Sequence, residues 1–216
     1  MQSEYIFKVI CCGDYSVGKT SIIKKAVYDE FSNLYKATLG VDFALKVLEY
    51  PQKQTNIRMQ IWDIGGQERQ KHMHRVFFRD AVGAIVVYDV TNEASFHSAK
   101  EWKKEIDKSV FLDDETRTQI PTILLGNKCD IPHQEFVKKE EIADFCKEHG
   151  FIQHMNVSAK TGRNIDASLR ELADVVMETC KDMIEEDEND PAEDAVILNQ
   201  DSDTMSAKVD KKGCCT

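Results

Sequence analysis

The sequence contains no apolar run that is long enough to cross a lipid bilayer. Its longest apolar stretch, residues 81–88, is well short of the roughly 20 residues that a spanning helix needs. The N-terminus lacks a basic segment followed by an apolar one, so no secretory signal is predicted and the expected compartment is the cytosol. An excess of positive charge is also missing, because 28 Lys and Arg stand against 38 Asp and Glu; this balance disfavours nucleic-acid binding.

The acidic excess is concentrated at the end of the chain. Residues 185–216 hold ten acidic residues against three lysines, so they carry −7 of the total charge of −10. Apart from an apolar patch at residues 195–198, this stretch is polar and of low complexity, and we expect it to be disordered. The sequence therefore predicts a folded domain at residues 1–184 and a disordered acidic tail at residues 185–216.

The seven cysteines do not suggest a disulfide framework. Cys11 and Cys12 are neighbours on an expected strand, and their side chains point to opposite faces, so they are poor partners for each other. We predict reduced thiols for the first five cysteines. Cys214 and Cys215 stand apart from the folded domain and need a different interpretation.

Apolar segments that suit strands alternate with amphipathic segments that suit helices. The expected strands are residues 6–12, 41–50, 56–62, 81–88, 120–125 and 154–157. A Pro-Gln-Lys-Gln turn joins the second strand to the third as an antiparallel hairpin. The pattern predicts an α/β fold: a doubly wound, six-stranded, mostly parallel sheet with one antiparallel edge hairpin and helices on both faces. Ligands of such sheets bind at the carboxyl ends of the strands.

The first strand is followed by residues 13–20, GDYSVGKT, which match the phosphate-loop pattern G-x-x-x-x-G-K-[ST]. Glycines allow the tight wrap, backbone N–H groups converge on an anion, and the following helix N-terminus adds partial positive charge. Lys19 can reach the terminal phosphates, and the Thr20 hydroxyl can hold Mg²⁺. The phosphate-binding residues expected here are Ser16, Val17, Gly18, Lys19, Thr20 and Ser21. A Gly-rich turn without function is the weaker alternative, because strand, loop and helix come in the required order.

Asp63, Gly66 and Gln67 follow the third expected strand. A carboxylate at a strand end opposite a phosphate loop is positioned to hold Mg²⁺, commonly through water. The Gly66 N–H can approach the terminal phosphate, and Gln67 can orient an attacking water. These residues, with Lys19, predict phosphate hydrolysis.

The next strand end carries Asn127, Lys128 and Asp130 in the pattern N-K-x-D. The Asp130 carboxylate can accept hydrogen bonds from N1–H and the 2-amino group of guanine, whereas adenine has an acceptor at N1 and lacks that amine. After the last strand, the run Ser158, Ala159 and Lys160 can offer a backbone N–H to guanine O6. The predicted base is therefore guanine.

With these motifs in their usual order, residues 5–184 resemble a small GTPase of the Ras superfamily, and within it the Rab family. The resemblance implies a monomeric GTPase domain, with GTP or GDP as ligand and Mg²⁺ as cofactor. It also implies that Thr38 binds Mg²⁺ and senses the γ-phosphate, and that Phe31 packs beside the guanine. Residues 40–47, GVDFALKV, and Ile64 are most similar to the Rabs of lysosome-related organelles.

The last residues, Gly213, Cys214, Cys215 and Thr216, resemble the Rab signal for double geranylgeranylation. Two lipids are needed because one chain gives only marginal membrane binding. The resemblance implies a protein on the cytoplasmic face of an endosomal or lysosome-related membrane that cycles with the cytosol. Implied partners are an exchange factor, a GAP, effectors, a prenylation escort and a GDP-dissociation inhibitor. The patch at residues 195–198 either docks on the last two or is accidental composition.

Tyr15 departs from the family pattern, which usually has a small residue at this position of the phosphate loop. Its ring is expected near the γ-phosphate, where a GAP arginine enters. We therefore keep two hypotheses: a membrane-anchored switch in vesicle trafficking with slow, GAP-stimulated hydrolysis of GTP, and a GTP-locked scaffold with hydrolysis impaired by Tyr15.

Two further rivals share the phosphate loop. An adenine-nucleotide kinase or ATPase is disfavoured by Asp130, and a soluble nuclear-transport GTPase by the pair Cys214 and Cys215.

Overall fold

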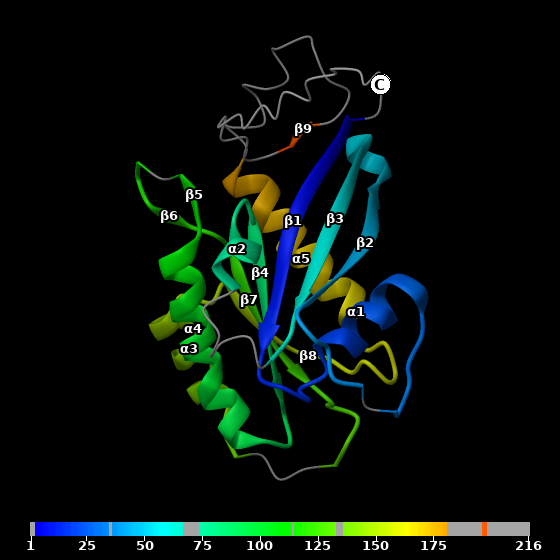
Figure 1. Cartoon of the computed structure of the whole chain (residues 1–216), viewed down its shortest axis with the longest axis vertical. Coiled ribbons are helices and arrows are strands. Elements are labelled where there is room, and N and C mark those ends of the chain that lie inside the picture. Colours follow the sequence, from blue (N-terminus) through cyan, green and yellow to red (C-terminus); the bar gives the residue numbers. More distant parts are fainter. Residues whose placement is uncertain are drawn as a thin grey trace, which may run out of the picture.

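The structure is a computed structural model that describes residues 3–34, 36–66, 74–113, 115–132, 136–180 and 196–197 (Figure 1). Within these ranges, strands and helices alternate as the sequence predicts. Gln67, Cys214 and Cys215, to which the sequence assigns functions, lie outside the described residues.

A mixed sheet forms the centre of the fold, with the strand order β2-β3-β1-β4-β7-β8. These strands are β1 (Ser3–Gly13), β2 (Val41–Tyr50), β3 (Thr55–Ile64), β4 (Gly83–Asp89), β7 (Thr122–Asn127) and β8 (Gln153–Asn156). Only β2 and β3 pair antiparallel; each of the other neighbours along this path pairs parallel. The predicted six-stranded sheet with one antiparallel edge pair is confirmed.

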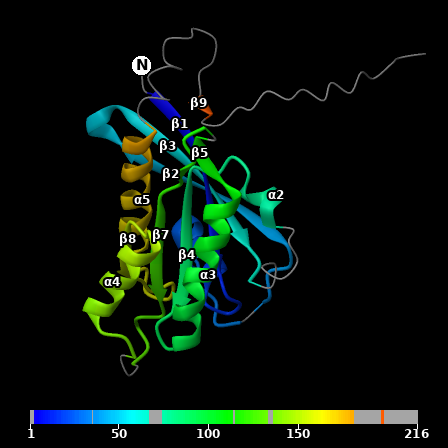
Figure 2. The ribbon, with the colours of Figure 1, turned by 90° about the vertical axis from the view of Figure 1, so that its left-hand side faces the viewer.

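Helices cover both faces of the sheet. They are α1 (Lys19–Tyr28), α2 (His74–Phe78), α3 (Glu93–Ser109), α4 (Lys139–His149) and α5 (Ile165–Thr179), with a short 3₁₀ turn η1 (Pro51–Lys53) in the β2–β3 hairpin. Figure 2 shows α5 on one side of the sheet and α2 and α3 on the other. Helix α1 contacts α5, and α4 lies beside the edge strand β8.

The apolar pattern of the sequence explains which elements are buried. Every residue of β4 and β7 is buried, as expected for central parallel strands covered on both faces. On α3, the buried stripe includes Phe96, Ala99, Trp102 and Ile106, the residues with helical spacing in the sequence. The stripe therefore belongs to the core, and we expect the functional residues in the loops.

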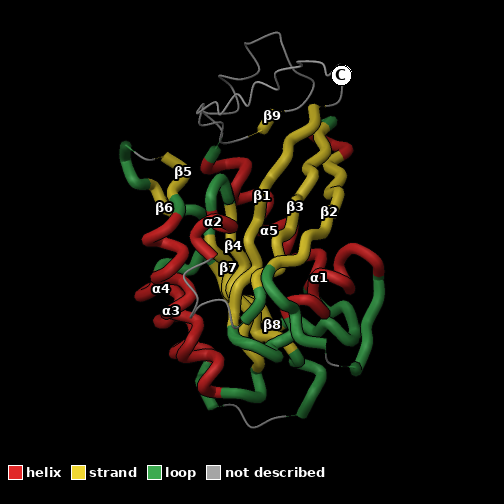
Figure 3. Tube along the Cα trace, in the orientation of Figure 1, coloured by secondary structure: helices red, strands yellow, loops and turns green. Residues whose placement is uncertain are grey.

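The carboxyl ends of β1, β3, β4, β7 and β8 meet at one edge of the sheet. These strands end at Gly13, Ile64, Asp89, Asn127 and Asn156. Figure 3 shows loops gathered at this edge, at the end of the sheet opposite β9. All the predicted nucleotide-binding motifs follow these strands or lie in the α1–β2 loop.

Some short elements were not predicted from the sequence. The chain forms a small hairpin of β5 (Phe111–Asp113) and β6 (Thr118–Gln119), and a two-residue strand β9 (Val196–Ile197) that pairs in parallel with Tyr5 and Ile6 of β1. Two or three residues are too few for a periodic pattern to be recognised. Strand β9 lies within the apolar patch of the tail.

The five described cysteines are free thiols, as the sequence predicts. Burial raises the pKa of both Cys146 and Cys180 to about 11, so these thiols stay protonated and unreactive near neutral pH. Among the helices of the described residues, none combines the length and the apolar composition that spanning a bilayer requires.

Candidate functional site

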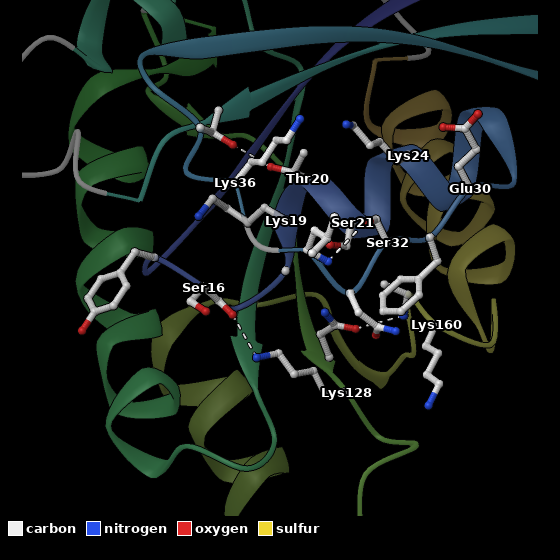
Figure 4. Close-up of a pocket in the computed structure, with 18 of the residues that line it drawn as sticks. Ser16, Lys19, Thr20, Ser21, Lys24, Glu30, Ser32, Lys36, Lys128 and Lys160 are labelled. Carbon is white, nitrogen blue, oxygen red and sulfur yellow. Dashed lines mark hydrogen bonds between the residues drawn. The ribbon is translucent and has the colours of Figure 1, made fainter.

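A cavity of about 750 Å³ lies at the carboxyl edge of the sheet (Figure 4). Its volume is in the range of pockets that hold a cofactor-sized ligand. Most of the predicted site residues line it: Ser16, Gly18, Lys19, Thr20, Ser21, Phe31, Thr38, Gly66, Asn127, Lys128, Asp130, Ala159 and Lys160. The fold thus brings together motifs that are more than a hundred residues apart in the sequence.

The phosphate loop surrounds Lys19, whose side chain is only 6% exposed. The Lys19 Nζ donates to the carbonyl oxygens of Gly13 and Asp14, both at 2.9 Å. Burial lowers the pKa of Lys19, and the nearby Asp63 carboxylate opposes this effect. A largely buried ammonium beside the free N–H groups of the first turn of α1 makes this end of the cavity suited to phosphate.

Two glycines are required by close approaches at the cavity. Gly18 has a φ of +97°, and a Cβ on it would lie 2.3 Å from the Asn127 amide nitrogen. A Cβ on Gly66 would lie 2.3 Å from the Tyr15 backbone nitrogen. A larger residue at Gly18 would push the phosphate loop away from Asn127, and a larger residue at Gly66 would push that segment away from Tyr15.

Thr20, Thr38 and Asp63 gather beside the phosphate loop. The two threonine hydroxyl oxygens are 2.7 Å apart, and Thr20 donates to the Oδ2 of Asp63. The Thr38 hydroxyl lies 3.5 Å from the same oxygen. Burial raises the pKa of Asp63, and the hydrogen bond from Thr20 opposes the increase.

This oxygen cluster fits a magnesium ion. The Asp63 Oδ1 is buried and has no hydrogen-bond partner among the described residues, so one acceptor is left for a ligand. Hydroxyl and carboxylate oxygens are ligands that Mg²⁺ prefers, often with water completing the shell. Two hydroxyls and one carboxylate differ from the Cys and His ligands that are typical of structural zinc sites.

Asn127 and Asp130 are oriented by hydrogen bonds on the opposite side of the cavity. The Asn127 amide donates to the Val17 carbonyl at 2.9 Å, and its oxygen accepts from the Ala159 N–H at 3.1 Å. The Ser158 hydroxyl donates to the Oδ1 of Asp130 at 2.6 Å. The Asp130 carboxylate is thereby held in one orientation at the cavity wall, with two oxygens that can accept from a guanine edge.

Three predicted site residues stand behind the cavity wall rather than in it. The Val17 side chain is in the core, Ser158 is buried beneath Asp130, and Asp63 is buried behind Thr20. Phe31, 39% exposed, and Lys160 lie at the wall itself.

Asp89 does not line the cavity, but it contacts the lining residue Lys128, and the sequence interpretation missed it. It ends β4, and its Oδ2 lies 2.5 Å from the Nζ of Lys128. The sequence did contain a signal for Asp89: like Asp63, it is an acidic residue directly after an apolar run. Asp89 belongs to no recognised motif, and its partner is known only from the fold.

His154 lies on β8 and contacts Tyr88 of β4. Its Nε2 is 2.9 Å from the Tyr88 hydroxyl, and its ring is stacked on the Tyr88 ring. Burial lowers the pKa of His154 from 6.5 to about 4, so the folded protein keeps this histidine neutral.

The free energy of unfolding is expected to fall as the pH drops through this range. Between pH 6.5 and about 4 the unfolded chain binds a proton at His154 and the folded chain does not. This difference lowers the free energy of unfolding by up to about 3 kcal/mol as the pH falls. The variant His154→Gln should lose this contribution. Denaturant unfolding at pH 7 and pH 4.5 measures it, with the exposed His97→Gln as control; equal pH dependence of wild type and His154→Gln would contradict the assignment.

The comparisons with known proteins agree with this geometry. Residues 8–178 match the model of the Ras family. The chain is 42% identical over 212 residues to the Ras-related protein Rab-32 of Homo sapiens, covering 98% of this chain and 90% of the relative. It is 44% identical over 176 residues to Rab-32A of Dictyostelium discoideum, covering 81% and 80%. It is 36% identical over 214 residues to Rab-7L1 of Homo sapiens, covering 98% of both.

Proposed function

This chain belongs to the Ras family, and we propose that it acts as a membrane-anchored GTP/GDP switch that recruits effectors in vesicle trafficking. Members of the family bind guanine nucleotide and hydrolyse GTP to GDP, so the chain is a GTPase. The similarity to Rab-32 and Rab-7L1 assigns it to the Rab branch. The observation that carries the proposal is the convergence of Lys19, Thr20 and Asp130 on one cavity.

The proposed chemistry is transfer of the γ-phosphoryl group to water. Lys19 and the amides of residues 16–21 stabilise the charge that develops on the phosphate oxygens. Gln67 orients the attacking water, and the Gly66 N–H contacts the terminal phosphate. Thr20, Thr38 and Asp63 would hold Mg²⁺, which when bound neutralises phosphate charge.

The switch depends on Thr38 and Gly66. Both line the cavity: Thr38 lies in the loop before β2, and Gly66 lies in the loop after β3. Contacts of these two residues with a γ-phosphate order both loops in the GTP state, and hydrolysis releases them. The exposed surface formed in the GTP state is the one that effectors recognise.

Membrane attachment is proposed to come from the tail. Geranylgeranyl groups on Cys214 and Cys215 anchor the protein, and the acidic segment of residues 185–216 links them to the GTPase domain of residues 1–184. Lys211 and Lys212 add only about 1 kcal/mol each at an anionic leaflet, and the acidic residues oppose them. The protein therefore works on the cytoplasmic face of endosomal or lysosome-related membranes and cycles through the cytosol with an escort or a dissociation inhibitor.

Tyr15 supports a second candidate, a scaffold that stays in the GTP state. Tyr15 is 68% exposed and lines the cavity, and a Cβ on Gly66 would lie 2.3 Å from its backbone nitrogen. A ring in this position obstructs an arginine that a GAP inserts beside the γ-phosphate, a contribution worth about 10³–10⁵ in rate.

The variant Tyr15→Ser separates the two candidates. If the ring blocks the arginine, GAP-stimulated hydrolysis of bound GTP should be at least about tenfold faster in Tyr15→Ser than in wild type. Tyr15→Phe keeps the ring and should behave as wild type does. Phosphate release from preloaded GTP is the measurement. Equal GAP-stimulated rates for wild type and Tyr15→Ser would exclude the locked scaffold.

A further inference from the structure

The carboxylate of Asp89 is oriented from two sides. Its Oδ1 accepts hydrogen bonds from the Thr91 backbone N–H at 2.9 Å and from the Thr91 hydroxyl at 2.7 Å. Its Oδ2 lies 2.5 Å from the Nζ of Lys128. Both oxygens are therefore engaged, and the side chain, 10% exposed, has a fixed direction.

The backbone around Asp89 is fixed as well. The Asp89 N–H donates to the Ser95 hydroxyl at 3.0 Å, and the Asn92 N–H donates to the Asp89 carbonyl at 2.9 Å. The next residue, Val90, donates its N–H to the Asn127 carbonyl at 3.0 Å. The end of β4 is thus tied both to the start of α3 and to the end of β7.

Lys128 connects this fixed carboxylate to the phosphate loop. Its Nζ donates to the Ser16 carbonyl at 2.9 Å, and Figure 4 shows its side chain extending to Ser16 across the cavity wall. One ammonium thus joins three segments: the end of β4, the loop after β7, and the phosphate loop. Both loop residues have left-handed backbone angles, with a φ of +62° at Ser16 and +68° at Lys128.

The ion pair is the stronger part of this connection. A hydrogen bond between an ammonium and a carboxylate is roughly twice as strong as one between neutral groups. Asp89 is largely buried and the Lys128 side chain is 30% exposed, so solvent screens the pair less than it screens a surface pair. Without the carboxylate, Lys128 would keep only the neutral Ser16 carbonyl among the contacts of the described residues, and it would gain other orientations in solvent.

We infer, on the basis of the proposed function, that Asp89 is a positioning residue for the bound nucleotide. It acts through Lys128, which it holds across the cavity wall, and so it keeps the loop with Asn127 and Asp130 closed against the phosphate loop. A nucleotide that contacts both loops can leave only when they separate. Asp89 therefore slows nucleotide release and has much less influence on the hydrolysis of nucleotide already bound.

The variant Asp89→Asn tests this role, because it is nearly isosteric, can still accept from Thr91, and lacks the charge. In the full-length chain, release of a fluorescent GDP analogue into excess GDP is expected to be at least about tenfold faster than in wild type. Single-turnover hydrolysis of bound GTP is expected to change by less than about threefold, a separation that general loosening of the fold would not produce. Thr91→Ala, which removes the hydroxyl hydrogen bond to the carboxylate but keeps the ion pair with Lys128, should accelerate release much less.

A double-variant cycle assigns the effect to Lys128. Lys128→Met should accelerate release by itself, and adding Asp89→Asn to it should accelerate release little further, because the two residues act as one unit. Asp89→Glu keeps the charge on a longer stem, and its release rate should lie nearer to wild type than that of Asp89→Asn.

Two results would overturn the inference: release from Asp89→Asn within twofold of wild type, or fully additive effects in the double variant. Failure of wild type to bind the GDP analogue would instead contradict the proposed function.

Discussion

Replacing Asp130 with asparagine is expected to shift the base preference of the site from guanine to xanthine. A carboxylate accepts from both N1–H and the 2-amino group of guanine, whereas an asparagine amide accepts with one atom and donates with the other. The donating amide faces the 2-amino group of guanine without a bond, but it can bond the 2-carbonyl of xanthine. Because an unpaired donor in a closed site is costly, guanine affinity should fall by about 100-fold or more.

Competition of GDP, XDP and ADP against a fluorescent GDP analogue measures this preference. The hydrogen bond from Ser158 to Asp130 provides a matched control: Ser158→Ala should weaken GDP binding without any gain for XDP. Preference of wild type for ADP would support the rival adenine-nucleotide enzyme. Unchanged discrimination in Asp130→Asn would show that Asp130 does not contact the base.

Replacing both Cys214 and Cys215 with serine is expected to move the protein from membranes to the cytosol. Two geranylgeranyl chains hold a protein at a bilayer, whereas a single lipid chain gives marginal, reversible binding. Each single variant should therefore lie between wild type and the double variant. Flotation of full-length protein from eukaryotic cells with membranes measures the bound fraction.

Nucleotide binding is the control for this experiment. Both cysteines lie beyond residues 8–178, which match the Ras family, so the double variant should bind GDP as wild type does. If the double variant still floats with membranes, anchoring does not come from these cysteines, although the nucleotide switch would be unaffected.

Candidate site residues that belong to a short motif, with fixed spacing between its members, could be identified from the sequence alone. Lys19, Asp63 and Asp130 each belong to a short motif whose chemistry depends on local geometry: a glycine-rich turn, or an acid directly after a buried strand. The fold supplied what no motif contains, namely that Asn127 and Lys128 hydrogen-bond to the phosphate loop more than a hundred residues away. These contacts depend on the strand order of the sheet, which brings β1, β4 and β7 side by side.

Supporting residues were harder to predict than residues that face the ligand. Ser158 was expected beside guanine O6 as part of a run that offers backbone N–H groups, but its hydroxyl orients Asp130. Asp89 was not identified at all, because its role depends on Lys128, 39 positions later, and not on any local pattern. Strand β2 has the predicted bounds, whereas the bounds of the other five predicted strands shifted by one to three residues. Strand β4, for example, begins at Gly83 rather than at residue 81, and it extends to Asp89 because backbone pairing with β7 continues past the apolar run.

Single-turnover hydrolysis of GTP by the full-length chain shows whether it is a switch that returns to the GDP state by its own activity. The protein is loaded with GTP in the absence of free nucleotide, Mg²⁺ is supplied, and conversion to GDP is followed without any GAP. Slow but complete conversion is expected, with a rate at least about tenfold lower for Gln67→Leu, which cannot orient the attacking water. A wild-type rate no higher than that of Gln67→Leu would contradict the proposed function, because the chain would then bind GTP without ending the GTP state by its own hydrolysis.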